Sequence, residues 1–181
     1  SSVTGVQTCA LPIFFVARVG QASHSFLMLD DQIRDWRLAL GPFTSLPLVG
    51  TASTAGGSSL GPVYYWVLWL SRVTIGPFVH NLPHAGAYGI AVLQGVADLV
   101  LLFALRKRRG WGVALVAVLL MATSPHDLAV SATIWNPAVS VALVKIAIAL
   151  RLRQDGPVSS AAAFTVMAAA WLAVQAHSAA V

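Results

Sequence analysis

The second half of the chain alternates long apolar runs with short polar segments. The apolar runs cover residues 85–105, 111–130, 133–150 and 159–178. The first run has the length of one bilayer crossing, since a helix of about 20 residues spans a hydrocarbon core of roughly 30 Å. Pro125 interrupts the second run, which therefore needs other helices to cover its far end. The pattern predicts four membrane-spanning helices after residue 84.

The first half has a different pattern, in which aromatic and charged positions interrupt the apolar ones. Residues 14–29 are interpreted as the end of a first span. Residues 30–40 (DDQIRDWRLAL) place apolar side chains among charged ones, as in a helix that lies on a membrane surface. The tyrosines and tryptophans of residues 63–78 are typical of the membrane–water interface. We therefore expect residues 30–84 to form an outer loop that carries surface helices.

The composition also indicates a membrane protein. Hydrophobic residues make up 57% of the 181 residues and charged residues only 9%, against about 25% charged residues in an average soluble domain. So few charges could not cover the surface of a soluble protein of this size, and much of the surface must contact lipid. The expected fold class is an all-α, polytopic transmembrane helical bundle with surface helices in the first outer loop.

The net charge of +5 is concentrated in two places. Residues 106–109 (RKRR) form one cluster, and Arg151 and Arg153 form another, each directly after an apolar run. Basic residues at the ends of spans are typical of cytoplasmic loops. We therefore interpret the charge as a topology signal, with the lipid bilayer as the partner and no nucleic acid bound.

Residues 1–13 need separate treatment. The stretch VTGVQTCALPI (3–13) resembles the translation of a common sequencing adapter, so we expect residues 1–13 to be a read-assembly artefact and exclude them from fold reasoning. The only cysteine, Cys9, lies inside this stretch, so cysteine usage says nothing about redox compartment. The chain ends inside an apolar run, and we expect it to be part of a longer protein.

With the basic clusters on the cytoplasmic side, the polar residues of interest gather on the opposite side. Residues 30–84, the SPHD segment (124–127), the WNP segment (135–137) and His177 all fall outside. A purely structural bundle would not need this asymmetry, whereas a catalytic or binding face would. We expect a functional site on the extracytoplasmic side of a multi-pass protein of the bacterial inner membrane.

Asp30 and Asp31 open the predicted surface helix and are the leading site candidates. Their carboxylates could act as a general base or bind a metal at the membrane surface. Aspartate is also a good helix N-cap and suits the helix dipole, so spacing alone leaves both interpretations open.

Motifs for metal binding are weak. His80 and His84 are four residues apart, but Pro83 interrupts a continuous helix and the chain has no glutamate. Zinc motifs of this spacing need both histidines on one helical face. We predict no cofactor and no metal site, and a divalent metal is unsupported.

Asp98 and Lys145 are ionisable residues inside predicted spans, at similar depth. Residues of this kind usually pair with each other or line a pathway. A structural ion pair and a transport pathway are the two interpretations.

Several segments resemble one family, the GT-C glycosyltransferases that use polyprenyl-phosphate-sugar donors and include protein mannosyltransferases and the aminoarabinose transferase of lipid A. The acidic pair before a surface helix is similar to the first extracytoplasmic loop of that family. The order of the further segments is also similar, and the resemblance covers residues 14–181. These segments are DDQIRDW (30–36), GGSSLGPVYYW (56–66), SPHDLAVSATIWNP (124–137) and QAH (175–177).

The resemblance implies transfer of a hexosyl or pentosyl group to an extracytoplasmic acceptor of unknown identity, by an inverting single displacement. It assigns the catalytic role to Asp31 or Asp30. Family members usually carry Asp-Glu where this chain has Asp-Asp-Gln, which leaves the choice open and weakens any inference of a metal. Cationic partners for the donor phosphate would be Arg34, Arg37 and Arg72.

The alternative function is that of a permease or transporter. It would rest on Asp98, Lys145 and the proline-broken segments. An inverted repeat, which transporters of this kind often contain, is not found in these 181 residues.

Overall fold

The computed structural model describes residues 15–24, 26–51, 57–58, 61–131, 133–154 and 157–177. Residues 1–13, with the expected artefact and Cys9, lie outside the described residues. Residues 15–24 are helical. The elements that follow are α2 (Asp30–Ala39), η1 (Phe43–Ser45), α3 (Val63–Ile75), η2 (Gly76–Phe78), α4 (Pro83–Ala122), α5 (Pro125–Ser131), α6 (Asn136–Leu152) and α7 (Ser160–Ala176). The described residues contain helices and no strands, which confirms the all-α fold class.

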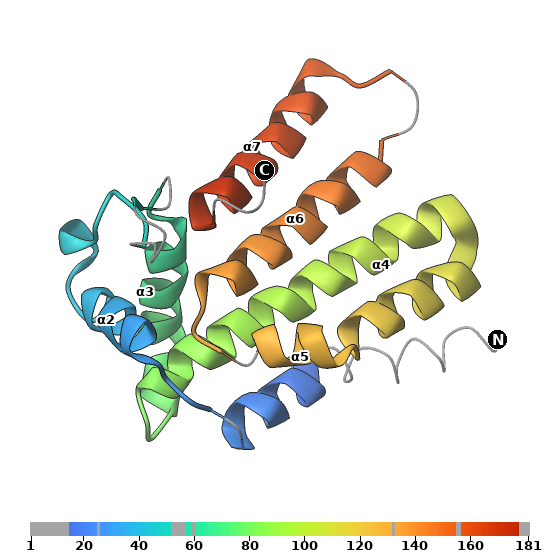
Figure 1. Ribbon diagram of the computed structural model, residues 1–181. Helices are drawn as coiled ribbons and strands as arrows, with labels where there is room; N and C mark the ends of the chain where they lie inside the picture. Colours follow the sequence, from blue (N-terminus) through green and yellow to red (C-terminus); the bar gives the residue numbers. More distant parts are fainter. Residues whose placement is uncertain are drawn as a thin grey trace.

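α4 is a helical hairpin (Figure 1). Gly110 has φ 78° and ψ 172°, a conformation that is essentially limited to glycine. The chain reverses at this residue, and the arm formed by residues 111–122 packs back against the arm formed by residues 83–109. Side chains from both arms meet in one buried apolar cluster, which includes Leu101, Ala104, Ala114 and Val118.

Among the described helices, α4 alone is long and apolar enough to cross a membrane. Its first arm, residues 83–109, is about 40 Å long at 1.5 Å per residue. A second crossing is counted only if α5 and α6, which are bent by 116° relative to each other, form one span. α7 is apolar but has only 17 residues. The described helices therefore provide one crossing, or two if α5 and α6 form one span, by length and composition.

The predicted span 111–130 is divided in two. The second arm of α4 ends at Ala122, and α5 begins at Pro125. Proline suits the first helical position because the N–H that it lacks would have no helical partner there. Ser124 Oγ accepts the backbone N–H of Asp127 at 3.2 Å, which is the usual geometry of a serine N-cap. The SPHD segment therefore starts a new short helix instead of continuing the span.

The remaining helices pack around the long arm of α4. α6 lies between α4 and α7, and α3 packs against the start of α4 (Figure 1). α3 approaches α4 closely at Gly89, where a Cβ atom would lie only 1.8 Å from Ser71 Oγ. The core at this end includes Tyr64, Leu68, Ile90 and Val139, each at most 1% exposed.

We expect Gly110→Ala to lower the free energy of unfolding by about 1–3 kcal/mol, since alanine is strained at these dihedral angles. Titration of the protein in mixed micelles with sodium dodecyl sulfate would measure the change. Gly112→Ala is the matched control, because Gly112 lies in the same arm with open space at its Cβ position. There alanine should be neutral or stabilising by up to about 1 kcal/mol. Equal losses for both variants would contradict the role given to Gly110.

Candidate functional site

α2 docks on the bundle through one face. Its buried residues are Gln32, Asp35, Trp36 and Ala39, whose spacing of three to four residues defines one side of a helix. The Trp36 ring packs over Gly86 of α4, where a Cβ atom would lie 2.8 Å from the ring. Since no larger residue would fit beneath the ring, Gly86 lets α2 lie close against the start of α4.

The exposed side chains of α2 include four of the five residues predicted to form the site. Asp30, Asp31, Arg34 and Arg37 are exposed. Asp30, Arg34 and Arg37 follow one another at intervals of four and three residues, which places them in one row along the helix. The fold therefore brings the two carboxylates and two of the predicted phosphate-binding guanidinium groups onto one exposed surface.

The two aspartates differ in their contacts. The N-cap of α2 is Leu29, not an aspartate, and the Leu29 N–H donates to Gln32 Oε1 at 3.0 Å. Asp31 Oδ1 accepts the Gln32 N–H at 2.9 Å, so Asp31 helps to hold the first turn. Within the described residues, the Asp30 carboxylate has no hydrogen bond or ion pair. Asp31 therefore stabilises the start of the helix through a side-chain hydrogen bond, whereas Asp30 makes no such bond to a described residue.

A third aspartate of α2, which the sequence analysis did not select, is buried beneath this surface. Asp35 Oδ1 accepts hydrogen bonds from Arg34 at 2.8 and 2.9 Å and from the Tyr65 hydroxyl at 3.3 Å. Burial raises the pKa of Asp35 above its usual value, against the opposite effect of the Arg34 guanidinium. Its position in the sequence, one helical turn after Asp31, was the feature that could have identified Asp35 as a neighbour of the acidic pair. Asp35 fixes Arg34 and links α2 to α3.

Arg72 lies apart from the other predicted phosphate ligands. Its guanidinium donates to the carbonyl of Leu40 at 2.7 Å and to that of Gly41 at 3.1 Å. These contacts satisfy carbonyl groups at the C-terminal end of α2, which favours cations. The first turn of α2 is about 15 Å away along the helix, so Arg72 supports the surface helix from its far end.

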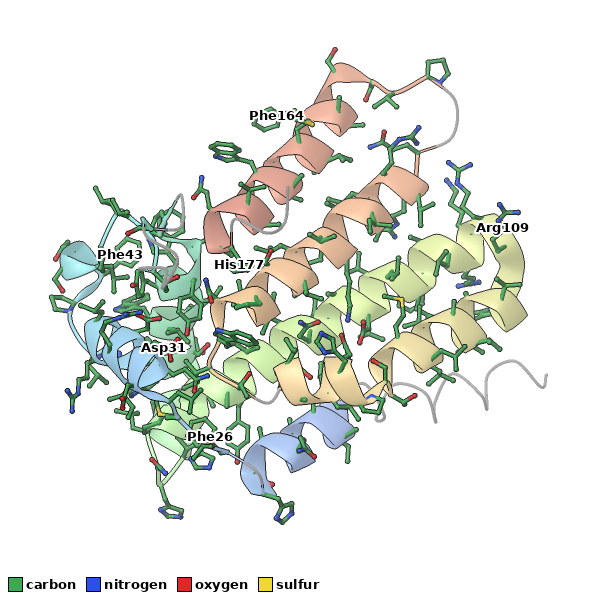
Figure 2. The ribbon with its side chains drawn as sticks, in the orientation of Figure 1. Phe26, Asp31, Phe43, Arg109, Phe164 and His177 are labelled. Atoms are coloured by element: carbon green, nitrogen blue, oxygen red, sulfur yellow. The ribbon has the colours of Figure 1, made fainter. Side chains whose placement is uncertain are left out.

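The basic clusters meet at the other end of the long arm. Lys107 Nζ donates to the Arg153 carbonyl at 3.1 Å, and Arg108 donates to the carbonyls of Leu152, at 2.6 Å, and Gln154. Figure 2 shows Arg109 and Asp31 at opposite ends of α4. The structure thus separates the acidic surface helix from both basic clusters, as the charge pattern predicts.

The WNP segment and the end of α7 come together. Asn136 Nδ2 lies 2.9 Å from Thr51 Oγ1 and 3.1 Å from His177 Nδ1. Figure 2 places His177 on the side of the bundle that faces α3. These residues are far apart in sequence, and their contact agrees with the prediction that they share one side.

A second constellation lies inside the bundle. Lys145 Nζ contacts Asp98 Oδ1 at 2.9 Å, Asp127 Oδ1 at 2.8 Å and Gln94 Oε1 at 3.1 Å. Arg18 pairs with Asp98 Oδ2 at 2.6 Å and also with Asp127. The ion pair of Asp98 with Lys145, one of the two interpretations of these residues, is present. Two carboxylates and two cations together form a neutral cluster.

Asp127 differs from the sequence-based expectation. The topology argument placed the SPHD segment on the outer side, but the structure places Asp127 beside Asp98, inside the bundle. The reason is the short second arm of α4, which ends at Ala122 and leaves the start of α5 within the bundle. Pro125 indicated from the sequence that the helix breaks here. How deep in the bundle the break lies depends on the hairpin at Gly110, which the sequence analysis did not predict.

In the part of the chain that the structure describes, no group of three His, Cys or Asp side chains could hold a metal ion. His80 and His84 instead line a cavity of about 340 Å³ together with Phe78, Asn81 and Tyr88. His84 also contacts the ring of Phe26 at 4.4 Å. The proline between the two histidines, Pro83, is the first residue of α4.

Comparison of the chain with protein families, with curated proteins and with solved structures finds no match.

We expect Asp98→Ala and Lys145→Ala each to lower the free energy of unfolding by about 3–5 kcal/mol, because each leaves an uncompensated buried charge. The double variant keeps the neutral pair of Arg18 and Asp127 and should lose less than the sum of the single changes. Unfolding in mixed micelles would give an interaction energy of about 0.5–3 kcal/mol.

The matched control for this cycle is the exposed pair Asp30→Ala and Arg37→Ala on α2, whose effects should be small and additive. Additive losses in the buried cycle would contradict the coupling of Asp98 and Lys145.

Proposed function

We propose that this chain belongs to a polytopic membrane glycosyltransferase of the GT-C type, which transfers a hexosyl or pentosyl group from a polyprenyl-phosphate donor to an extracytoplasmic acceptor. One observation carries the proposal. Asp30 and Asp31 are exposed at the start of α2, and Asp30 lies in one row with the exposed Arg34 and Arg37, at the end of the bundle opposite the basic clusters. A base and cations for a leaving phosphate therefore share one accessible surface.

The chemistry is a single displacement. The acceptor oxygen or nitrogen forms a bond to the anomeric carbon, while the bond from that carbon to the donor phosphate oxygen breaks and its electron pair stays on the phosphate. The acceptor proton passes to a carboxylate. Asp30, which has no partner among the described residues, suits the role of base, and Asp31 suits that of orienting the acceptor. Arg34 and Arg37 would neutralise the departing phosphate.

The proposed topology has four crossings after residue 84. The first arm of α4 runs inward, the second arm with α5 runs outward, α6 runs inward and α7 runs outward. The basic clusters then lie in the cytoplasm and α2 lies on the outer surface of a bacterial inner membrane. The separation of acidic and basic residues along α4 supports this arrangement, as does the usual bias of basic loops toward the cytoplasm.

A permease is the second candidate, favoured by the buried charge cluster. Asp98, Asp127 and Lys145 meet beside the break between α4 and α5. Broken helices with ionisable groups inside the membrane are typical of transporters. Solute flux into proteoliposomes that depends on Lys145, without any sugar transfer, would favour the permease over the transferase.

The topology can be tested with single cysteines in a Cys9→Ser background. Leu38→Cys on the exposed side of α2 should react with a membrane-impermeant maleimide in intact cells. Arg109→Cys should react only after the membrane is opened, because a cytoplasmic basic loop is protected from outside. The reverse labelling pattern would overturn both the topology and the placement of the site.

Asp30→Asn should lower sugar transfer by about 10²- to 10⁴-fold, because asparagine keeps the size of the side chain but cannot take a proton. Membrane insertion and donor-lipid binding should remain. Asp31→Asn should lower sugar transfer less than Asp30→Asn does. Asparagine at position 31 can still accept the Gln32 N–H, and it stabilises the start of a helix about as well as aspartate. Transfer of labelled sugar from a polyprenyl-phosphate donor in membranes measures both. Wild-type turnover in both variants would remove the aspartates from the mechanism.

A further inference from the structure

An apolar groove runs between α6 and α7 at the basic end of the bundle. Its volume is about 360 Å³. Small and branched side chains leave the groove open between the two helices. It is lined by Val144, Ala147, Ile148 and Leu152 of α6 and by Val166 and Ala170 of α7. None of these six side chains can form a hydrogen bond, so this part of the groove suits a hydrocarbon ligand.

The mouth of the groove carries a positive charge. Arg151 lines the groove, lies in the last turn of α6 and is exposed. No described carboxylate forms an ion pair with it. From Arg151 to Val144 the groove follows α6 for about 10 Å. A guanidinium above a strip of apolar surface matches the order of a lipid phosphate above its acyl chain.

A second cavity extends the positive charge across the other side of α6. It has a volume of about 340 Å³ and is lined by Phe103, Arg106, Lys107 and Arg153. Arg153 follows Arg151 by two residues, so both cavities open at the same level of the bundle. Basic pockets between membrane helices on the cytoplasmic side are suited to anionic lipid head groups.

We infer that this end of the bundle binds an anionic phospholipid, with one acyl chain in the groove between α6 and α7 and the phosphate on Arg151. The charge at the mouth selects an anionic head group, whereas a further apolar helix would gain nothing from it. The site is distinct from the donor site, because α2 lies at the opposite end of α4. The inference does not rest on glycosyl transfer.

The test titrates the purified protein in micelles with phosphatidylglycerol and, separately, with phosphatidylcholine, and counts bound lipid by native mass spectrometry. Salt at 0.15 M screens distant charges. Phosphatidylglycerol should bind more tightly, and Arg151→Gln should weaken its binding about fivefold, the usual effect of one basic residue near a lipid surface. Arg109→Gln, which changes the other basic cluster and lines neither cavity, should change binding less than about twofold.

The groove itself is tested without changing charge. Ala170→Leu should fill it and weaken phosphatidylglycerol binding, whereas Ala161→Leu on the exposed side of α7 should not. Val166→Leu provides a second filled groove, and thermal unfolding without lipid verifies that each variant is folded.

Three results would overturn the inference. Equal binding of both lipids would remove the anionic head group. If Arg109→Gln and Arg151→Gln weakened phosphatidylglycerol binding equally, the binding would depend on the overall positive charge of this end and not on a site at Arg151. Unchanged lipid binding in both filled-groove variants would show that the acyl chain does not occupy the groove. A change in self-association of these variants, with lipid binding unchanged, would show the same.

Discussion

The buried charges of Arg18, Asp98, Asp127 and Lys145 constrain the whole bundle. Taking an ion out of water costs several kcal/mol even after relaxation, so each charge must meet a partner from another segment. A slip of α6 by one turn, about 5.4 Å, would separate Lys145 from the carboxylates that it contacts at 2.9 and 2.8 Å. In the membrane setting that we propose, apolar packing alone would select helix register weakly. The cluster therefore fixes the relative register of the helical residues 15–24, α4, α5 and α6.

A fixed register in the middle allows the two ends of the bundle to differ. At one end, Lys107 and Arg108 donate to the last carbonyls of α6 and its following turn, which satisfies a helix C-terminus and concentrates positive charge. At the other end, Trp36 over Gly86 holds α2 against the bundle. The amphipathic pattern of α2 then decides which charges face water, and the acidic pair is among them.

The helices of the fold were largely predictable, whereas the way they meet was not. Hydrophobic runs predict the long arm of α4, α6 and α7 because a long uninterrupted apolar run favours one continuous helix. The charge pattern predicts that the acidic and basic residues lie at opposite ends. The similar depth of Asp98 and Lys145 allowed their pairing as one of two interpretations. The positions of Arg18 and Asp127 in the same cluster were not predicted, because they depend on how residues 15–24 pack against α4 and on the reversal at Gly110. Within the site, the row of Asp30, Arg34 and Arg37 is a consequence of helical spacing, but the burial of Asp35 and the distant position of Arg72 depend on tertiary contacts.

The geometry of α2 also bears on why neighbouring aspartates would take different roles. Asp31 is oriented by the N–H that it accepts from Gln32, while Asp30 can turn toward an acceptor. Along the helix axis, Arg34 and Arg37 lie about 6 and 10 Å beyond Asp30. An inverting displacement needs its base and its leaving group on opposite sides of the anomeric carbon, and in inverting glycosidases the two catalytic groups are roughly 6.5–9.5 Å apart. Under the proposed function, one row of a single surface helix would therefore place a base and a cation at a spacing of this order, on either side of a sugar ring. A rigid bundle beneath that helix would hold the row in place while the acceptor and donor exchange.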